Sequence, residues 1–186
     1  LLAVQQDACR ANIRHLESIE ASLDSSTRLA EIAEIQEELI ASGYLHEKMP
    51  RKNKDRRAQP FSFTAPDGMT ILVGKNNTQN DALTFRTAAP TDLWLHVRDI
   101  PGSHVILRTG GEAPSEETLH LAAQIAAHFS KARGSSNVPV DYTAIRFVKK
   151  PSGSVPGFVR FTHEKTLFVT EDEEALAPIL AQDPTV

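Results

Sequence analysis

Residues 92–104, Asp-Leu-Trp-Leu-His-Val-Arg-Asp-Ile-Pro-Gly-Ser-His, decide the fold that we expect for this chain. Side chains of a β-strand point alternately to opposite faces of a sheet. One face of this strand is aliphatic, which is typical of a core, and consists of Leu93, Leu95 and Val97. The other face consists of Asp92, Trp94, His96 and Arg98. Such a mixture indicates a recognition surface, and the alternative is a packed indole among solvated polar groups.

The loop after this strand decides whether its two histidines share a face. A two-residue turn at 101–102 would put His104 on the face opposite to His96. A three-residue loop at 100–102 would place Arg98 opposite His104 and both histidines on the Trp94 face. A Pro-Gly step favours a type II turn, which fits a two-residue hairpin poorly. We therefore favour the longer loop.

The surrounding sequence predicts an α+β domain with a mostly antiparallel sheet and one main amphipathic helix. Two-residue periodicity and turn residues predict strands at 61–63, 70–73, 83–86, 93–98, 104–108, 144–149, 157–163 and 166–170. The main helix is expected at 115–132, with Ser115 as its N-cap. Its buried stripe is expected to be Leu119, Ala122, Ala123, Ala126 and Phe129. A short helix interrupted by Pro178 is expected at 171–181.

A helical, coiled-coil-like segment is expected before this domain. The residues that recur every seven positions, as in a coiled-coil seam, are Leu2, Cys9, Leu16 and Leu23. We interpret Cys9 as a packing residue for this reason. A second helix would end near Gly43 and present one apolar face, formed by Leu29, Ile32, Ile35 and Leu39. The two helices could pack on each other, or the first could complete a coiled coil whose other strand is absent.

Several ungapped sequence segments resemble the NFACT-R domain. They are VGKNNTQND at 73–81, DLWLH at 92–96, DIPGSH at 99–104, PSEET at 114–118, FSKARGSS at 129–136, VPVDY at 138–142 and PGFV at 156–159. The domain belongs to the ribosome quality-control factors called RqcH in bacteria and NEMF in animals, which are often labelled fibronectin-binding protein A. The resemblance implies the end of a coiled-coil arm at 1–45, a basic linker at 46–60 and an NFACT-R-like domain at 61–186.

The resemblance implies an RNA- and ribosome-binding function. NFACT proteins bind obstructed large ribosomal subunits that carry peptidyl-tRNA, and they support alanine tailing of the stalled chain. The implied partners are the large ribosomal subunit, rRNA and tRNA, alanine tRNA in particular. Because peptide transfer would belong to the ribosome, we expect no enzymatic residue, no cofactor, no metal and a cytoplasmic location. The tRNA-recognition and helix-hairpin-helix modules of the family have no counterpart in this sequence.

We expect RNA or ribosome contacts from the family's motif positions, which are Lys75, Asn76, Asn77, Asp81, Asp92, Trp94, His96, Gly102, Ser103 and His104. Arg98, Lys131 and Arg133 extend this set, and Lys149 and Lys150 could extend the surface further. Lys75 and the amides after it either grip phosphate and sugar oxygens or build a turn. Trp94 either stacks on an unpaired base or packs in the core. The uncharged Ser-Gly-Ser-Val at 152–155, where the family often has basic residues, weakens the case for RNA contact there.

The charge of the chain is unevenly distributed. Its formal net charge is −4, but segment 48–57 has six basic residues and one acid, a local charge of +5 that leaves −9 for the remainder. A concentrated basic cluster creates a directional field that the net charge hides. We expect the linker to contact RNA through Arg51, Lys52, Lys54, Arg56 and Arg57. A solvated linker without a ligand is the alternative.

Two other functions compete with RNA binding. One is a surface adhesin for fibronectin or fibrinogen, although the sequence has no wall anchor or membrane span. The other is a metal-dependent RNA-processing enzyme that uses His96 and His104 with Asp92 or Asp99, although their spacing matches no familiar metal motif. The single cysteine allows no internal disulfide, which is typical of a reducing compartment. The first residue is Leu rather than Met, which indicates a piece of a longer protein.

Overall fold

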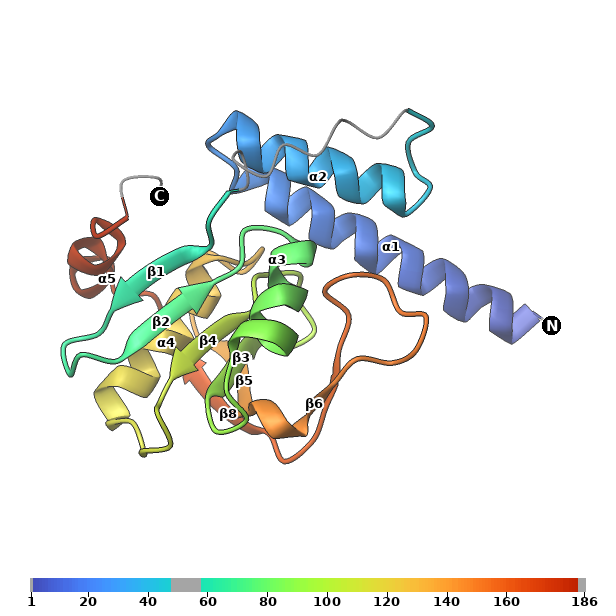
Figure 1. Ribbon diagram of the computed structural model, residues 1–186. Helices are drawn as coiled ribbons and strands as arrows, with labels where there is room; N and C mark the ends of the chain where they lie inside the picture. Colours follow the sequence, from blue (N-terminus) through green and yellow to red (C-terminus); the bar gives the residue numbers. More distant parts are fainter. Residues whose placement is uncertain (1, 48–57, 184–186) are drawn as a thin grey trace.

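The computed structural model describes residues 2–47 and 58–183 (Figure 1). The helices, in chain order, are α1 (Leu2–Asp24), α2 (Leu29–Ala41), α3 (Asn77–Ala82), α4 (Glu116–His128) and α5 (Glu173–Leu180). The strands are β1 (Phe61–Thr64), β2 (Thr70–Val73), β3 (Leu93–Val97), β4 (Val105–Arg108), β5 (Val138–Ala144), β6 (Val148–Lys149), β7 (Arg160–Phe161) and β8 (Lys165–Val169). A π-helical turn η2 (Leu83–Thr87) and a 3₁₀ turn η3 (Ile145–Phe147) complete the elements. The fold is α+β, as predicted.

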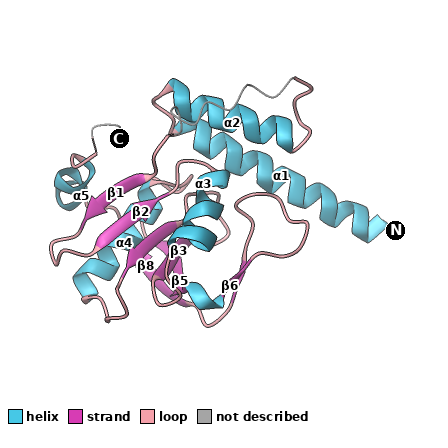
Figure 2. Ribbon diagram, in the orientation of Figure 1, coloured by secondary structure: helices cyan, strands magenta, loops and turns pink. Residues whose placement is uncertain are grey.

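A six-stranded antiparallel sheet in the order β1-β2-β4-β3-β5-β8 lies between two helical layers (Figure 2). On one face, Leu95 and Val97 pack in the larger core with the alanines of α4. On the other face, Trp94 packs in a smaller core with Ile106 and with Leu83 of η2. The alternation predicted for β3 is therefore confirmed. Each of its faces contributes to a separate core.

The main helix forms where the sequence predicts it, but it is shorter at its C-terminal end. The Ser115 side chain caps the first turn by accepting a hydrogen bond from the backbone N–H of Thr118, at 3.1 Å. The helix ends at His128 rather than near 132. One reason is that the next carbonyl, of Phe129, accepts a hydrogen bond from the backbone N–H of Ser103 at 2.9 Å. This bond ties the end of α4 to the β3–β4 connection.

Two predicted strands are wrong. Residues 83–86 continue α3 as the turn η2, which closes with a helical hydrogen bond from the backbone N–H of Ala88 to the carbonyl of Leu83, at 2.9 Å. The prediction at 144–149 missed strand β5, which ends at Ala144 and is followed by η3 and the two-residue β6. Pro139 within β5 disguises this strand, because proline lacks the N–H that a sheet requires.

The first two helices lie side by side and contact α3 (Figure 1). The predicted seam on α1 is largely solvent-exposed, as shown by Cys9, Leu16 and Leu23, so the packing role expected for Cys9 is wrong. On α2, Ile35 is buried but Leu29 is 86% exposed. The inward positions are instead partly polar: they are His15 and Ile19 on α1, and Glu31, Ile35 and Glu38 on α2. Across the described residues, no helix is long and apolar enough to span a membrane.

Candidate functional site

A pocket of about 490 Å³ opens beside the Trp94 face of the sheet. Its walls come from α1, from the β3–β4 connection and from the segment before β7. The lining residues with polar or aromatic groups include Arg14, Ser18, His96, Arg98, Asp141 and Phe158. The pocket thus gathers His96 and Arg98 from the strand that the sequence singles out, together with α1, which the sequence did not connect to it.

The two histidines face each other across neighbouring strands. Leu95 pairs with Val105, so the next position along β3 places His96 opposite His104. Their ring centroids are 5.7 Å apart, with planes at 88°. The prediction that both lie on the Trp94 face is confirmed. The predicted register is wrong, because the connection is longer than the three-residue loop that would put Arg98 opposite His104.

His104 is buried and both of its ring nitrogens have partners. Its Nε2 lies 3.1 Å from the carbonyl oxygen of Gly157, and its Nδ1 lies 2.8 Å from the Thr84 hydroxyl oxygen. A carbonyl only accepts, so we assign a hydrogen to Nε2. The Thr84 hydroxyl also donates to the Asn80 carbonyl at 2.8 Å, so its single hydrogen is shared between that carbonyl and His104 Nδ1. Burial, and secondarily the proximity of His96, lower the pKa of His104 to about 3. Burial also lowers the pKa of His96. Both rings are therefore neutral at pH 7.

The lowered pKa of His104 predicts an acid-sensitive fold. The unfolded chain protonates this ring near pH 6.5, whereas the folded chain does so only near pH 3. Between these values the unfolded state binds more protons, so the free energy of unfolding falls as the pH falls. We expect His104→Asn to reduce this slope, by at most about 1.4 kcal/mol per pH unit. Urea denaturation across this range measures it, and equal slopes for both proteins would contradict the assignment.

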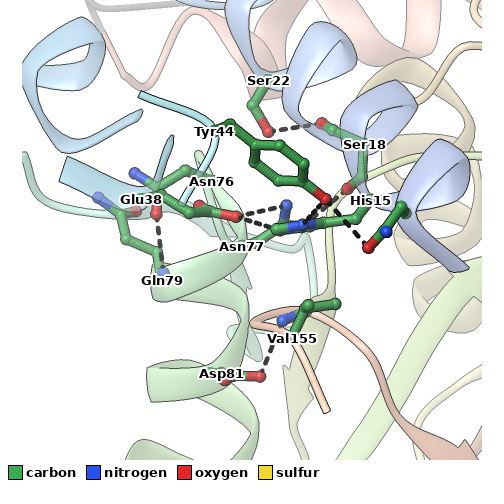
Figure 3. Close-up of polar contacts among 12 residues, drawn as sticks. His15, Ser18, Ser22, Glu38, Tyr44, Asn76, Asn77, Gln79, Asp81 and Val155 are labelled. Atoms are coloured by element: carbon green, nitrogen blue, oxygen red, sulfur yellow. Dashed lines mark hydrogen bonds and ion pairs between the residues drawn. The ribbon is translucent and has the colours of Figure 1, made fainter. Parts of the chain in front are cut away.

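The Lys75-Asn76-Asn77 motif binds carboxylates of α2 rather than facing solvent. Lys75 Nζ lies 2.8 Å from Glu31 Oε1. Asn77 Nδ2 donates to Glu38 Oε1 at 2.9 Å, and the same oxygen lies 3.0 Å from His15 Nε2 (Figure 3). We call this set the helix clasp, and its members are His15, Glu31, Glu34, Glu38, Lys75, Asn76, Asn77 and Gln79. The clasp fixes α1 and α2 on the domain.

Asp81 and two glycines shape the segment that borders the pocket. Asp81 Oδ1 accepts a hydrogen bond from the Gly157 N–H at 3.0 Å, and its other oxygen pairs with Lys150. Gly157 has φ +78°, and a Cβ there would come within 2.4 Å of Asn77 Oδ1. A Cβ on Gly102 would come within 2.7 Å of Ser130 Cβ. At both positions the backbone lies so close to a neighbouring side chain that only glycine fits.

Asp92, Ser103 and Trp94 also make internal contacts. Asp92 accepts hydrogen bonds from the backbone N–H of Ala89 and of Thr109, at 2.8 and 3.1 Å. The Ser103 hydroxyl donates to a backbone carbonyl at 2.6 Å. Trp94 is 1% exposed, and its ring lies parallel to His96 at 5.6 Å. The sequence allowed either base stacking or core packing for Trp94. In the structure Trp94 packs in the core and presents no free face to a base.

The exposed residues among the predicted contacts lie around the pocket mouth and after α4. Arg98 is 42% exposed and donates two hydrogen bonds to Asp141, at 2.7 and 3.0 Å, which raise its pKa. Lys131 is exposed and pairs with Glu20 on α1, and Arg133 is exposed. The predicted linker contacts, Arg51, Lys52, Lys54, Arg56 and Arg57, lie outside the described residues.

The sequence analysis did not identify the carboxylates that pair with Lys75 and Arg98, which are Glu31 and Asp141. A signal was available for the buried glutamates, because Glu31, Ile35 and Glu38 fall on one face of a helix. No comparable signal marked Asp141, which lies within a strand that was not predicted. In residues 2–47 and 58–183, no three His, Cys, Asp or Glu side chains are grouped to hold a metal ion.

Comparison with known proteins identifies the family. The model of the NFACT protein RNA binding domain matches residues 59–161, which is more than half of the chain. The chain belongs to the NFACT-R family. RqcH of Bacillus subtilis is similar, with 50% identity over 155 residues, which are 82% of this chain and 27% of that protein. RqcH of Streptococcus suis is 47% identical over 168 residues, 90% of this chain and 30% of that protein.

A solved structure of a related protein has the same fold. The C-terminal part of the fibronectin/fibrinogen-binding protein from Streptococcus suis superposes with a TM-score of 0.86 at 44% identity. The match covers 96% of this chain and 71% of that structure. The chain spans less than a third of the length of the two RqcH proteins.

Proposed function

We propose that this chain is the RNA- and ribosome-binding module of a ribosome quality-control factor. Membership of the NFACT-R family carries the proposal, because the family is described as RNA-binding and its model matches residues 59–161. The RNA would be held by exposed cations, since contacts to phosphate supply most of the affinity of such proteins. The +5 segment at 48–57 supplies six basic residues for this role.

Within this proposal, the factor binds obstructed large ribosomal subunits that carry peptidyl-tRNA, and it supports alanine tailing of stalled chains. The chain acts in the cytoplasm as a binding module without chemistry of its own. Its partners are rRNA and tRNA. The similarity to RqcH over most of this chain supports this finer function.

The pocket mouth is the proposed contact within the described domain. Arg98 is held by Asp141 on one side and remains partly exposed on the other, so its guanidinium is oriented before a ligand arrives. The neutral His96 ring beside it offers a further polar edge. The helix clasp supports this site by holding α1, which forms one of its walls.

Neutralising the basic linker is expected to weaken RNA binding and leave the domain folded. The variant replaces Arg51, Lys52, Lys54, Arg56 and Arg57 by Gln. Each lost phosphate contact should flatten the plot of log affinity against log salt by about 0.7–0.9. Fluorescence anisotropy with labelled RNA over a salt series measures the slope, and a melting curve controls for folding. An unchanged slope would remove the linker from the interface.

A second candidate function is binding of fibronectin or fibrinogen. The observation that favours it is the name of the Streptococcus suis structure, which shares this fold at 44% identity. A pulldown at physiological salt separates the two functions. The chain is expected to retain large-subunit RNA and tRNA from a bacterial lysate. Retention of purified fibronectin or fibrinogen in place of RNA would favour the adhesin.

A further inference from the structure

A small basic ribbon lies outside the main sheet. Among the described strands, β6 and β7 pair only with each other, with Val148 opposite Phe161 and Lys149 opposite Arg160. Val148 and Phe161 point inward and pack in the Trp94 core. Because side chains alternate along a strand, Lys149 and Arg160 point outward, and both are exposed. The core therefore anchors a ribbon whose outer face presents two cations.

The charge on this ribbon is not balanced locally. Segment 142–163 has four basic residues, Arg146, Lys149, Lys150 and Arg160, and no acidic residue, in a chain of net charge −4. Lys150 pairs with Asp81. Among the described residues, no carboxylate lies within 4.0 Å of the side-chain nitrogens of Lys149 or Arg160. Like charges directly opposite each other on paired strands are unfavourable, so this arrangement suits an anionic ligand.

Planar side chains continue the ribbon at one end. Because the strands are antiparallel, Arg146 and His163 both lie at the Val148–Phe161 end of the ribbon. The Arg146 guanidinium lies 4.9 Å from the Phe147 ring centroid, and that ring stacks on His163 at 4.2 Å. In this cluster Arg146 and His163 are exposed, and arginine and aromatic rings are side chains that hold sugar–phosphate backbone and unpaired bases.

We infer that the outer face of the β6–β7 ribbon is a second RNA contact, separate from the pocket mouth and the linker. Lys149 and Arg160 would bind phosphates, and the Arg146–Phe147–His163 cluster at the Val148–Phe161 end of the ribbon would lie against nearby nucleotides. The uncharged loop at 152–155 need not touch the RNA, because the cations lie on the strands that flank it. This inference rests on the proposed RNA binding. It names a surface outside the sequence segments that resemble the family.

The test compares two double variants of the full chain. Lys149→Gln/Arg160→Gln removes two charges from the ribbon. Arg10→Gln/Arg28→Gln removes two exposed charges from the helical segment and serves as the matched control. Fluorescence anisotropy with a labelled single-stranded oligouridine is recorded over a salt series, with poly-glutamate as a competing polyanion. Both variants should melt like the wild type, because all four side chains are exposed.

We expect the ribbon variant to flatten the salt slope by about 1.4, corresponding to two single-strand phosphate contacts, and to weaken binding roughly ten-fold at physiological salt. The control should keep the wild-type slope. A wild-type slope in the ribbon variant would overturn the ribbon contact and leave RNA binding by the domain intact. A wild type that binds no RNA would overturn both. Equal displacement of RNA by poly-glutamate would overturn the assignment to nucleic acid.

Discussion

Replacing Trp94 by alanine is expected to reduce the free energy of unfolding by about 3–5 kcal/mol and to leave the RNA affinity of the folded molecules unchanged. The indole is 1% exposed and packs against Ile106 and Val148. It also contacts the rings of His104 and Phe161, at centroid distances of 5.3 and 4.7 Å. Its removal leaves a cavity in the smaller core. Denaturation and anisotropy on the same sample measure both quantities.

Trp94→Phe is the matched control for this prediction. Among the described residues, the Trp94 Nε1–H is the one buried side-chain polar group without a hydrogen-bond partner. Phenylalanine therefore loses no hydrogen bond and keeps most of the ring, so it should cost less than half as much as alanine. A stable alanine variant whose RNA binding falls by about 1–3 kcal/mol would instead assign Trp94 to base stacking.

The parts of the fold that the sequence predicts well are those set by local periodicity. Strand β3 alternates between aliphatic and polar residues, and both faces are found as expected. The N-cap of α4 follows from spacing within a single helix, whereas the predicted stripe is only part of a buried run that includes every residue of 121–128. The strand prediction for residues 83–86 was wrong because the pattern of four residues alone does not distinguish a strand from a helical turn. The decisive fact is distant: Thr84 reaches the ring of His104, on another strand.

The roles of the site residues were harder to predict for the same physical reason. A row of Lys and Asn side chains offers the same donors to a phosphate or to a buried carboxylate. Which one they bind depends on residues elsewhere in the chain: Glu31 is 44 positions from Lys75. Arg98 likewise depends on Asp141, which is 43 positions away. Family resemblance selected the candidate positions, and only the fold separates those that make internal contacts from those that are exposed.

Replacing Lys75 by methionine is expected to destabilise the docked helices by about 3–5 kcal/mol without changing the salt dependence of RNA binding. The Lys75–Glu31 pair is buried, with side-chain exposures of 6% and 1%. Removing one partner of such a pair leaves a buried carboxylate without its cation, which is the costly case. Methionine keeps an apolar stem of similar length, so lost packing contributes little, but it also removes the ammonium that lies 3.9 Å from the Phe61 ring centroid. Denaturation and amide hydrogen exchange in α1 and α2 measure the effect.

The second variant, Lys75→Met in a Glu31→Gln background, separates the helix clasp from a phosphate site. Glutamine keeps an acceptor for the backbone N–H of Thr27, which Glu31 Oε2 binds at 2.9 Å, but it removes the buried charge. In that background the lysine substitution should cost far less than in the wild type, because no uncompensated charge remains. If Lys75 grips phosphate instead, its loss will flatten the salt slope by about 0.7–0.9 in both backgrounds. Equal costs of the substitution in the two backgrounds would likewise contradict the clasp, because its stabilisation depends on the Glu31 carboxylate.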